Sequence, residues 1–330
     1  VVGDSGLAVK AGSIKSYIDT ITSTASEGLT TTVVMEEMFY SHDRLVAYTE
    51  TRTESGEGLN FITTTERTST SYRGDRVTAY EEHVTTNAGS DDTIKRSDIV
   101  YDGMGNITSY NEETVSIDDT IRAERTNIAY NNFDQMISYD ETSTNSINDV
   151  QTIRWQNASY DAKGRLLGYE QATIINYSGT VVESSLTRSN ITYDNLGLMS
   201  GYEDTERSAR DGIADNYYRH SVTSGIKYDS VKNMAEFVSD SEKIAVEGDV
   251  VLYRTHTDRT ESTFNAEGKL TGYKESVRQY SPETEGTLAL DVTITTVRAD
   301  IEYYTKAEQD SWVVGDSGLA VKAGSIKSYI

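Results

Sequence analysis

The stretch from Tyr160 to Tyr169 reads YDAKGRLLGY, and it decides the fold because variants of it recur along the chain. Asp161 is a residue type that opens a type I turn, and Gly164 suits the left-handed position that follows. The stretch therefore predicts a β-hairpin with a short bulged loop of about three residues. Tyr160 would end the first strand of the hairpin, and Leu166 would begin the second.

Further copies of this motif occupy other parts of the chain. The clearest are Tyr101–Tyr110 (YDGMGNITSY), Tyr193–Tyr202 (YDNLGLMSGY) and Phe264–Tyr273 (FNAEGKLTGY), with turn glycines at Gly105, Gly197 and Gly268. Weaker copies close at Tyr17, Tyr48, Tyr80, Tyr139, Phe237 and Trp312. Successive closing aromatic residues are 29 (139 − 110) to 39 (312 − 273) residues apart. Each such unit predicts one hairpin, with the length variation in the exposed connections.

A longer repetition encloses the hairpin repeat. Residues 1–18 (VVGDSGLAVKAGSIKSYI) return unchanged as residues 313–330, an offset of 312 residues (313 − 1). The identity is either a duplication without structural meaning or the overlap between two periods of a longer tandem array, which we favour. Residues 1–312 would then form one period of about ten hairpins, and residues 313–330 would start the next period.

The segments between the motifs have the composition of strands. Thr, Val, Ile and Tyr alternate with polar residues, as in 189–193 and 292–297, and the chain has a single proline. Such segments favour long strands over helices. The fold prediction is all-β: long antiparallel hairpins of about 30 residues in a meander.

The predicted loop also fixes which residues lie opposite each other. Tyr101, Tyr160 and Tyr193 should face Ile107, Leu166 and Met199, respectively. The isoleucine two residues before the opening aromatic should face a small residue, in the pairs Ile99–Ser109, Ile128–Ser138 and Ile191–Gly201. Five residues before the opening aromatic, an arginine should face a carboxylate, in the pairs Arg96–Glu112, Arg125–Glu141, Arg188–Asp204 and Arg259–Glu275.

Alternation along the strands then predicts two different faces. The isoleucine, the opening tyrosine and the Leu, Ile or Met after the turn should form an apolar strip. The arginine–carboxylate pairs and the closing tyrosines Tyr110, Tyr169, Tyr202 and Tyr273 should lie on a wetter surface. About twenty strands spaced by roughly 4.8 Å make about 100 Å of sheet. A sheet of this width is expected to wind into a spiral, tube or shell.

The motif resembles that of YD-repeat proteins, the group that includes Rhs proteins and teneurins. Residues 160–166 (YDAKGRL) match its Y-D-x-x-G-R-L core, and the copies at Tyr101 and Tyr193 keep the Tyr, Asp and Gly. The resemblance implies hairpins wound into a spiral shell on secreted or surface-exposed proteins. It also implies that some such shells enclose a toxin.

The charge, the cysteine content and the distribution of apolar residues argue against several classes of function. The chain has 53 acidic and 30 basic residues and a net charge of −23, which argues against binding nucleic acid. It has no cysteine, and no apolar run reaches the roughly 18 residues of a membrane-spanning helix.

Catalytic, metal and cofactor sites are not expected. Gly3-Asp4-Ser5-Gly6, repeated at 315–318, resembles a serine protease loop, but the four histidines share no repeat position with which to supply a base. The acidic turns at 91–92 and 211–216 lack the ligand spacing of a calcium loop.

The leading hypothesis is therefore a structural protein: an extracellular or cell-surface fibre or tube whose partners are further copies of itself. One alternative is a Rhs-like shell that encloses or delivers a toxin. Another is an adhesin that binds glycans through rows of Tyr and Thr.

Overall fold

The computed structural model describes residues 14–22, 30–56, 59–266, 268–281, 290–303 and 326–328. Strands dominate these residues, and no helix occurs among them. Nineteen strands form one sheet in which consecutive strands pair antiparallel, and the last two form a separate pair. The predicted all-β meander of long hairpins is thus confirmed.

The strands differ mainly in length. In chain order they are β1 (Tyr17–Thr22), β2 (Thr30–Ser41), β3 (Arg44–Gly56), β4 (Leu59–Arg73), β5 (Arg76–Thr86), β6 (Asp91–Tyr101), β7 (Ile107–Val115), β8 (Thr120–Tyr130), β9 (Met136–Thr144) and β10 (Val150–Tyr160). They continue with β11 (Leu166–Tyr177), β12 (Thr180–Tyr193), β13 (Met199–Arg210), β14 (Ile213–Ala214), β15 (Tyr217–Tyr228), β16 (Met234–Ala245), β17 (Val251–Phe264), β18 (Leu270–Tyr280), β19 (Asp291–Arg298), β20 (Glu302–Tyr303) and β21 (Ile326–Ser328).

The motif turns have the expected chemistry. Asp161 Oδ1 accepts hydrogen bonds from the backbone N–H of Lys163 (2.8 Å) and Arg165 (2.9 Å), and Gly164 has a φ of 81°. Left-handed glycines also stand at the three other predicted turns, Gly105, Gly197 and Gly268. The opening residues face their predicted partners, in the pairs Tyr101–Ile107, Tyr160–Leu166 and Tyr193–Met199.

The predicted pairing of the isoleucines is wrong. Ser109 lies opposite Val100 and not Ile99, and the same shift sets Ala129 opposite Ser138 and Thr192 opposite Gly201. Its cause is a bulge three residues before the opening aromatic, where Asp98 has a φ of 52°. Ile99 is nevertheless buried (6% exposed), as expected for the apolar strip, while Val100 beside it is 51% exposed.

Small residues after the motif turn have a different role from the predicted one. A Cβ added to Gly168 would lie 2.7 Å from the carbonyl oxygen of Arg188, in the next hairpin along the sheet. A Cβ added to Gly201 would lie 2.8 Å from the carbonyl oxygen of Thr223, and one added to Gly272 would lie 3.0 Å from that of Arg298. The residue is therefore small because the neighbouring hairpin comes close.

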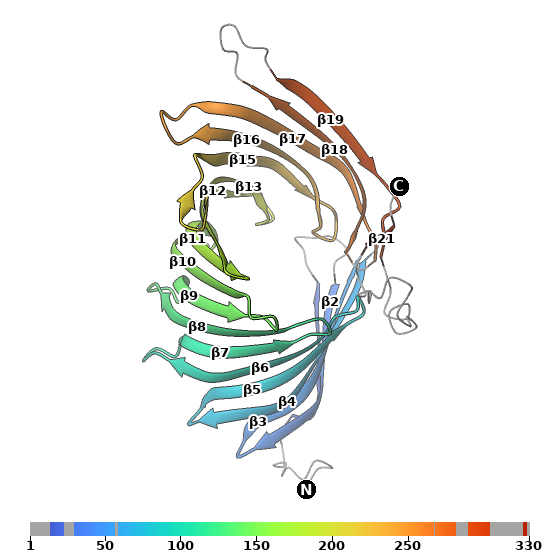
Figure 1. Cartoon of the computed structure of the whole chain (residues 1–330). Helices are drawn as coiled ribbons and strands as arrows, with labels where there is room; N and C mark the ends of the chain where they lie inside the picture. The colour runs from blue at the N-terminus through green and yellow to red at the C-terminus, as the bar shows by residue number, and fades with distance from the viewer. Residues whose placement is uncertain are drawn as a thin grey trace, which may run out of the picture.

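The whole sheet curls round on itself, and β18 and β19 reach the side of the molecule where β2 lies (Figure 1). The turn between β17 and β18 meets the turns at the opposite ends of earlier hairpins. There the N–H of Asn60 donates to the carbonyl of Ala266 (2.5 Å), and Lys269 Nζ donates to the carbonyl of Ala88 (3.2 Å). Among the described strands no pairing joins β19 to β1, so the sheet is curled but not closed.

Candidate functional site: an arginine and tyrosine ladder

One arrangement of side chains recurs at the joints between hairpins. In the first strand of a hairpin, the arginine five residues before the opening aromatic has a neighbour on each side. Arg96 of β6 lies opposite Tyr80, the closing aromatic of the preceding hairpin, and opposite Glu112 of its own hairpin. The joint therefore brings a ring, a guanidinium and a carboxylate into one row across three strands.

The four predicted ion pairs have the geometry of charge-assisted hydrogen bonds. Arg188 donates to Asp204 through Nε (2.8 Å) and Nη2 (2.7 Å), one bond to each carboxylate oxygen. Both nitrogens of Arg259 donate to Glu275 Oε2, at 2.9 and 2.6 Å. The pairs Arg96–Glu112 and Arg125–Glu141 repeat this arrangement through Nε and Nη2.

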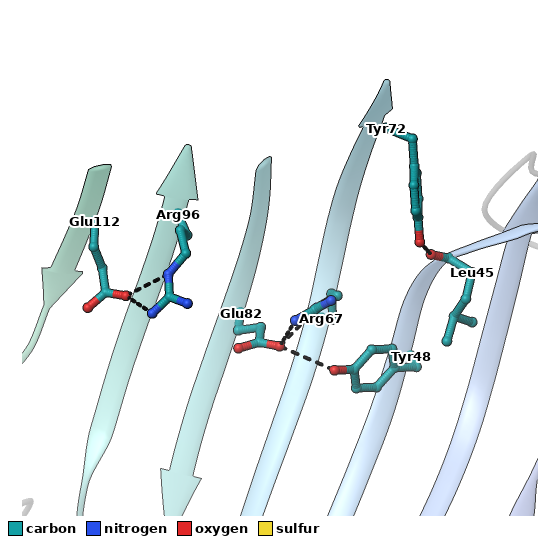
Figure 2. A network of polar contacts seen from close by, with 7 residues as sticks. All are labelled: Leu45, Tyr48, Arg67, Tyr72, Glu82, Arg96 and Glu112. Atoms are coloured by element: carbon teal, nitrogen blue, oxygen red, sulfur yellow. Dashed lines mark hydrogen bonds and ion pairs between the residues drawn. The ribbon is translucent and has the colours of Figure 1, made fainter. Parts of the chain in front are cut away.

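Sequence reasoning missed a fifth pair, Arg67 with Glu82, in which Arg67 Nε lies 2.8 Å from Glu82 Oε1 (Figure 2). Its hairpin turns through two residues, because Arg73 pairs directly with Arg76. The register of the longer motif loop does not apply to such a turn. The Gly-Asp step at residues 74–75 is the sequence signal that could have identified it.

The arginines also join the closing tyrosines into a continuous row. Arg96 lies over the rings of both Tyr80 (5.5 Å) and Tyr110 (4.1 Å), within cation–π distance. The equivalent arginines bridge their neighbours in the same way, so the row crosses the sheet. We call it the ladder: Tyr48, Arg67, Tyr80, Arg96, Tyr110, Arg125, Tyr139, Trp155, Tyr169, Arg188 and Tyr202.

Three of the described joints depart from the arginine pattern, and in two of them the facing residue changes as well. Trp155 stacks between Tyr139 (5.6 Å) and Tyr169 (5.7 Å), and it faces Gln171 where other joints have a carboxylate. At the joint beyond Tyr202, Thr223 faces Ser239, and their hydroxyls lie 3.3 Å apart. At the third, Met35 lies opposite Tyr17 on one side and Glu50 on the other, so the carboxylate remains although the cation is absent.

The ladder is drier than alternation of faces predicts. The side chain of Asp204 is only 8% exposed, and those of the ladder arginines are mostly shielded. The ladder arginines are nevertheless more exposed than the isoleucines of the predicted apolar strip, Ile99, Ile128 and Ile191. Burial raises the pKa of Tyr48 to about 12, and the Glu82 carboxylate, which accepts a hydrogen bond from the Tyr48 hydroxyl, adds to this rise. Such a phenol stays protonated at neutral pH.

A second row of tyrosines spans the same joints nearer the motif turns. In seven of the described hairpins the hydroxyl of the opening tyrosine donates to a backbone carbonyl of the preceding hairpin, as Tyr72 does to Leu45 at 2.6 Å (Figure 2). Phe264 occupies this position in one hairpin and has no hydroxyl. The other donors are Tyr101, Tyr130, Tyr160, Tyr193, Tyr228 and Tyr303, with acceptors Val77, Ile107, Met136, Leu166, Met199 and Leu270, respectively.

The remaining sequence candidates do not gather into a chemical site. Asp211 Oδ1 accepts the N–H of Val181 (2.9 Å), and Asp91 lies 2.8 Å from His83 in an exposed pair. No cluster of three metal-ligating side chains occurs within the described ranges, nor does a helix long and apolar enough to cross a membrane. Ser5, Ser317 and the weak motif copy ending at Trp312 lie outside the described residues.

In comparisons with known proteins, the sequence matches no family model and no curated protein. The resemblance to YD-repeat proteins accordingly rests on the motif residues alone.

Proposed function

We propose that the chain is a structural protein, one period of a tandem array that forms an extracellular or cell-surface fibre or tube. The observation that supports this most is the ladder. Five of the described joints repeat an arginine–carboxylate pair in equivalent positions, so a further hairpin can be added through a joint of the same kind.

The distribution of buried side chains agrees with this proposal. No large side chain of the described residues is fully buried, and most buried isoleucines and methionines stand two residues before an opening tyrosine: Met38, Ile99, Ile128, Ile191, Ile226 and Ile301. A single hairpin would leave these residues exposed, so each hairpin depends on its neighbours, as in other repeat proteins. The net charge of −23 would keep such assemblies apart from one another in solution.

A second candidate is a Rhs-like shell that encloses or delivers a toxin, and the motif at residues 160–166 favours it. The sequence of the whole gene would distinguish these two candidates. Many copies of the 312-residue period favour a fibre, whereas one array followed by an unrelated C-terminal domain favours a shell.

Electron microscopy of the natural multi-copy protein tests the proposal. We expect filaments with an axial repeat below roughly 100 Å, the width of about twenty strands laid side by side. Compact closed particles with internal mass would contradict the fibre and favour the shell.

A further inference from the structure

The described sheet ends in two edge strands, β1 and β19, each of which pairs with a single described strand. Both edges carry exposed apolar side chains, with Ile18 67% and Val297 67% exposed. Open edges of this kind invite pairing with another strand.

The pair of β20 and β21 shows which strand belongs beside β19. Tyr303 faces Ile326, as Tyr160 faces Leu166, so β20 and β21 are the two strands of one more hairpin. Asp300 has a φ of 51°, which places the bulge of the other hairpins between β19 and β20. The two strands β19 and β20 together are thus the first strand of this hairpin.

The second strand of this hairpin also occurs at the other end of the chain. Residues 326–328 repeat residues 14–16, so Ile14 stands where Ile326 stands. Residues 14–16 have no strand assignment in the structure, whereas residues 326–328, with β20 beside them, form β21. The same sequence is a strand where its hairpin partner is present.

Contacts of the N-terminal segment support this equivalence. The N–H of Met38 donates to the carbonyl of Lys15 (3.4 Å), just as the N–H of Ile301 donates to that of Thr271 (2.9 Å). Tyr17 faces Met35, as Tyr273 faces Arg298. Residues 14–17 therefore lie beside β2 in the same way as the start of β18 lies beside β19 and the residues before β20.

We infer that β1 of one copy of the chain pairs antiparallel with β19 and β20 of the preceding copy. Tyr303 faces Ile326, and Ile326 is Ile14 of the next period. In an antiparallel pair the numbers of facing residues have a constant sum, which is 317 here (303 + 14). Arg298 then faces Asp19 of the following copy (298 + 19 = 317). The partner is a second copy of this chain, so the inference rests on the tandem array proposed above.

This register would give the boundary the side chains of an ordinary joint. Arg298 already lies 5.6 Å from the ring centre of Tyr273, and Tyr17 of the next copy would take the place of the second ring. Asp19 would take the place that Asp204 has beside Arg188. The boundary between copies would therefore be one more rung of the same kind.

Disulfide trapping tests the register in a two-copy chain, in which residues 1–312 precede the full 330-residue chain. The protein has no cysteine, so Val297→Cys in the first copy and Thr20→Cys in the second leave one pair to oxidise. Facing residues in a sheet lie within disulfide distance. We expect loss of both free thiols and a cross-linked peptide after digestion. The matched control combines Val297→Cys with Ile18→Cys, a slip of two residues, and should keep its thiols.

A charge exchange provides an independent readout. Arg298→Glu in the first copy should lower the urea midpoint, and Asp19→Arg in the second copy should restore part of the loss. A disulfide between positions 18 and 297, disulfides in neither chain, or no restoration by the second charge would overturn the register.

The experiments distinguish a failure of this strand register from a failure of the proposed fibre. If the 20–297 disulfide forms while the natural multi-copy protein yields only compact particles, the strand pairing stands and the fibre fails. If filaments form but this disulfide does not, the fibre stands and the register fails.

Discussion

Arg188 and Asp204 meet through two parallel hydrogen bonds where neither side chain is well hydrated. The guanidinium also lies 3.9 Å from the ring centre of Tyr202. Hydrogen bonding to Asp204 is the main cause that raises the pKa of Arg188. One arginine thus satisfies a buried carboxylate and covers an aromatic ring, which makes it the most sensitive residue type in the repeat.

The Arg188→Glu variant should lose roughly 2 kcal/mol in the free energy of unfolding, because it sets two carboxylates together in a poorly hydrated joint. Asp204→Arg in the same chain should restore part of this loss. Urea denaturation of the single and double variants measures both effects. Arg219→Glu is the control, because its partner Glu206 is 4.0 Å away and half-exposed. Equal losses in the single and double variants would show that the pair does not contribute.

Acid should weaken the motif turns. Hydrogen bonding, led by the backbone N–H of Arg165, holds the pKa of Asp161 below its ordinary value. A carboxyl with a lowered folded pKa contributes stability above its unfolded value, near 3.8, and loses it as the pH falls through the folded pKa. The unfolding midpoint should therefore fall as the pH is lowered below about 5, and more steeply below about 4.

The Asp161→Asn variant should fold and show a shallower decline over this pH range. Asn131 already holds the same position in another hairpin and accepts the N–H of Phe133 (2.9 Å) and Gln135 (3.1 Å). Midpoints measured from pH 2 to 7 would compare the two proteins. An unchanged slope would mean that the charge of Asp161 has no part in acid sensitivity.

At the scale of the element, the sequence predicted the hairpin and its register because a tight turn sets both locally. It did not predict the bulge, because alternation assumes an unbroken strand. A signal was present, since the position three before the opening aromatic often holds a residue type that tolerates positive φ. Left-handed residues there are Glu37, Asp98, Asn127, Asn157, Asn190, Gly225, Glu261 and Asp300. The ladder was predicted only as separate pairs, because the register set by a turn fixes the partners within one hairpin and not those between neighbouring hairpins.

The bulge makes a prediction about Asn190, which has a φ of 52°. Asn190→Val should cost about 1–2 kcal/mol, because a β-branched residue is strained in this conformation. Asn190→Gly should be neutral or slightly stabilising. Asn176→Val, at an exposed site of β11 with ordinary φ, is the control and should change little. Thermal unfolding of the three variants would decide, and equal effects of Val at both sites would contradict a strained bulge.

At the scale of the whole molecule, the curl brings residues together that are far apart in the chain. Asn60 and Ala266 are 206 residues apart (266 − 60), yet their backbones are hydrogen bonded. No local pattern predicts such a contact, because it depends on small twists accumulated over many strands. The sequence could predict that a wide sheet winds, but not where it meets itself.

Lys269→Ala should loosen this meeting point, because the ammonium group donates to the carbonyl of Ala88 from the opposite side of the curl. Small-angle X-ray scattering should show a larger radius of gyration with little change in the unfolding midpoint. Lys163→Ala, in the exposed turn between β10 and β11, is the matched control and should leave the scattering unchanged. Identical scattering from both variants would show that the curl does not depend on this contact.

At the joint beyond Tyr202, Thr223 lies where other joints have an arginine, and its hydroxyl donates to that of Ser239. In a fibre under tension, the force would be shared among all joints, and the weakest of them would open first. In the tandem array proposed above, with a period of 312 residues, that joint would recur once in every period. A long array of this kind would then extend in equal steps as these joints open one after another and would shorten again when they close.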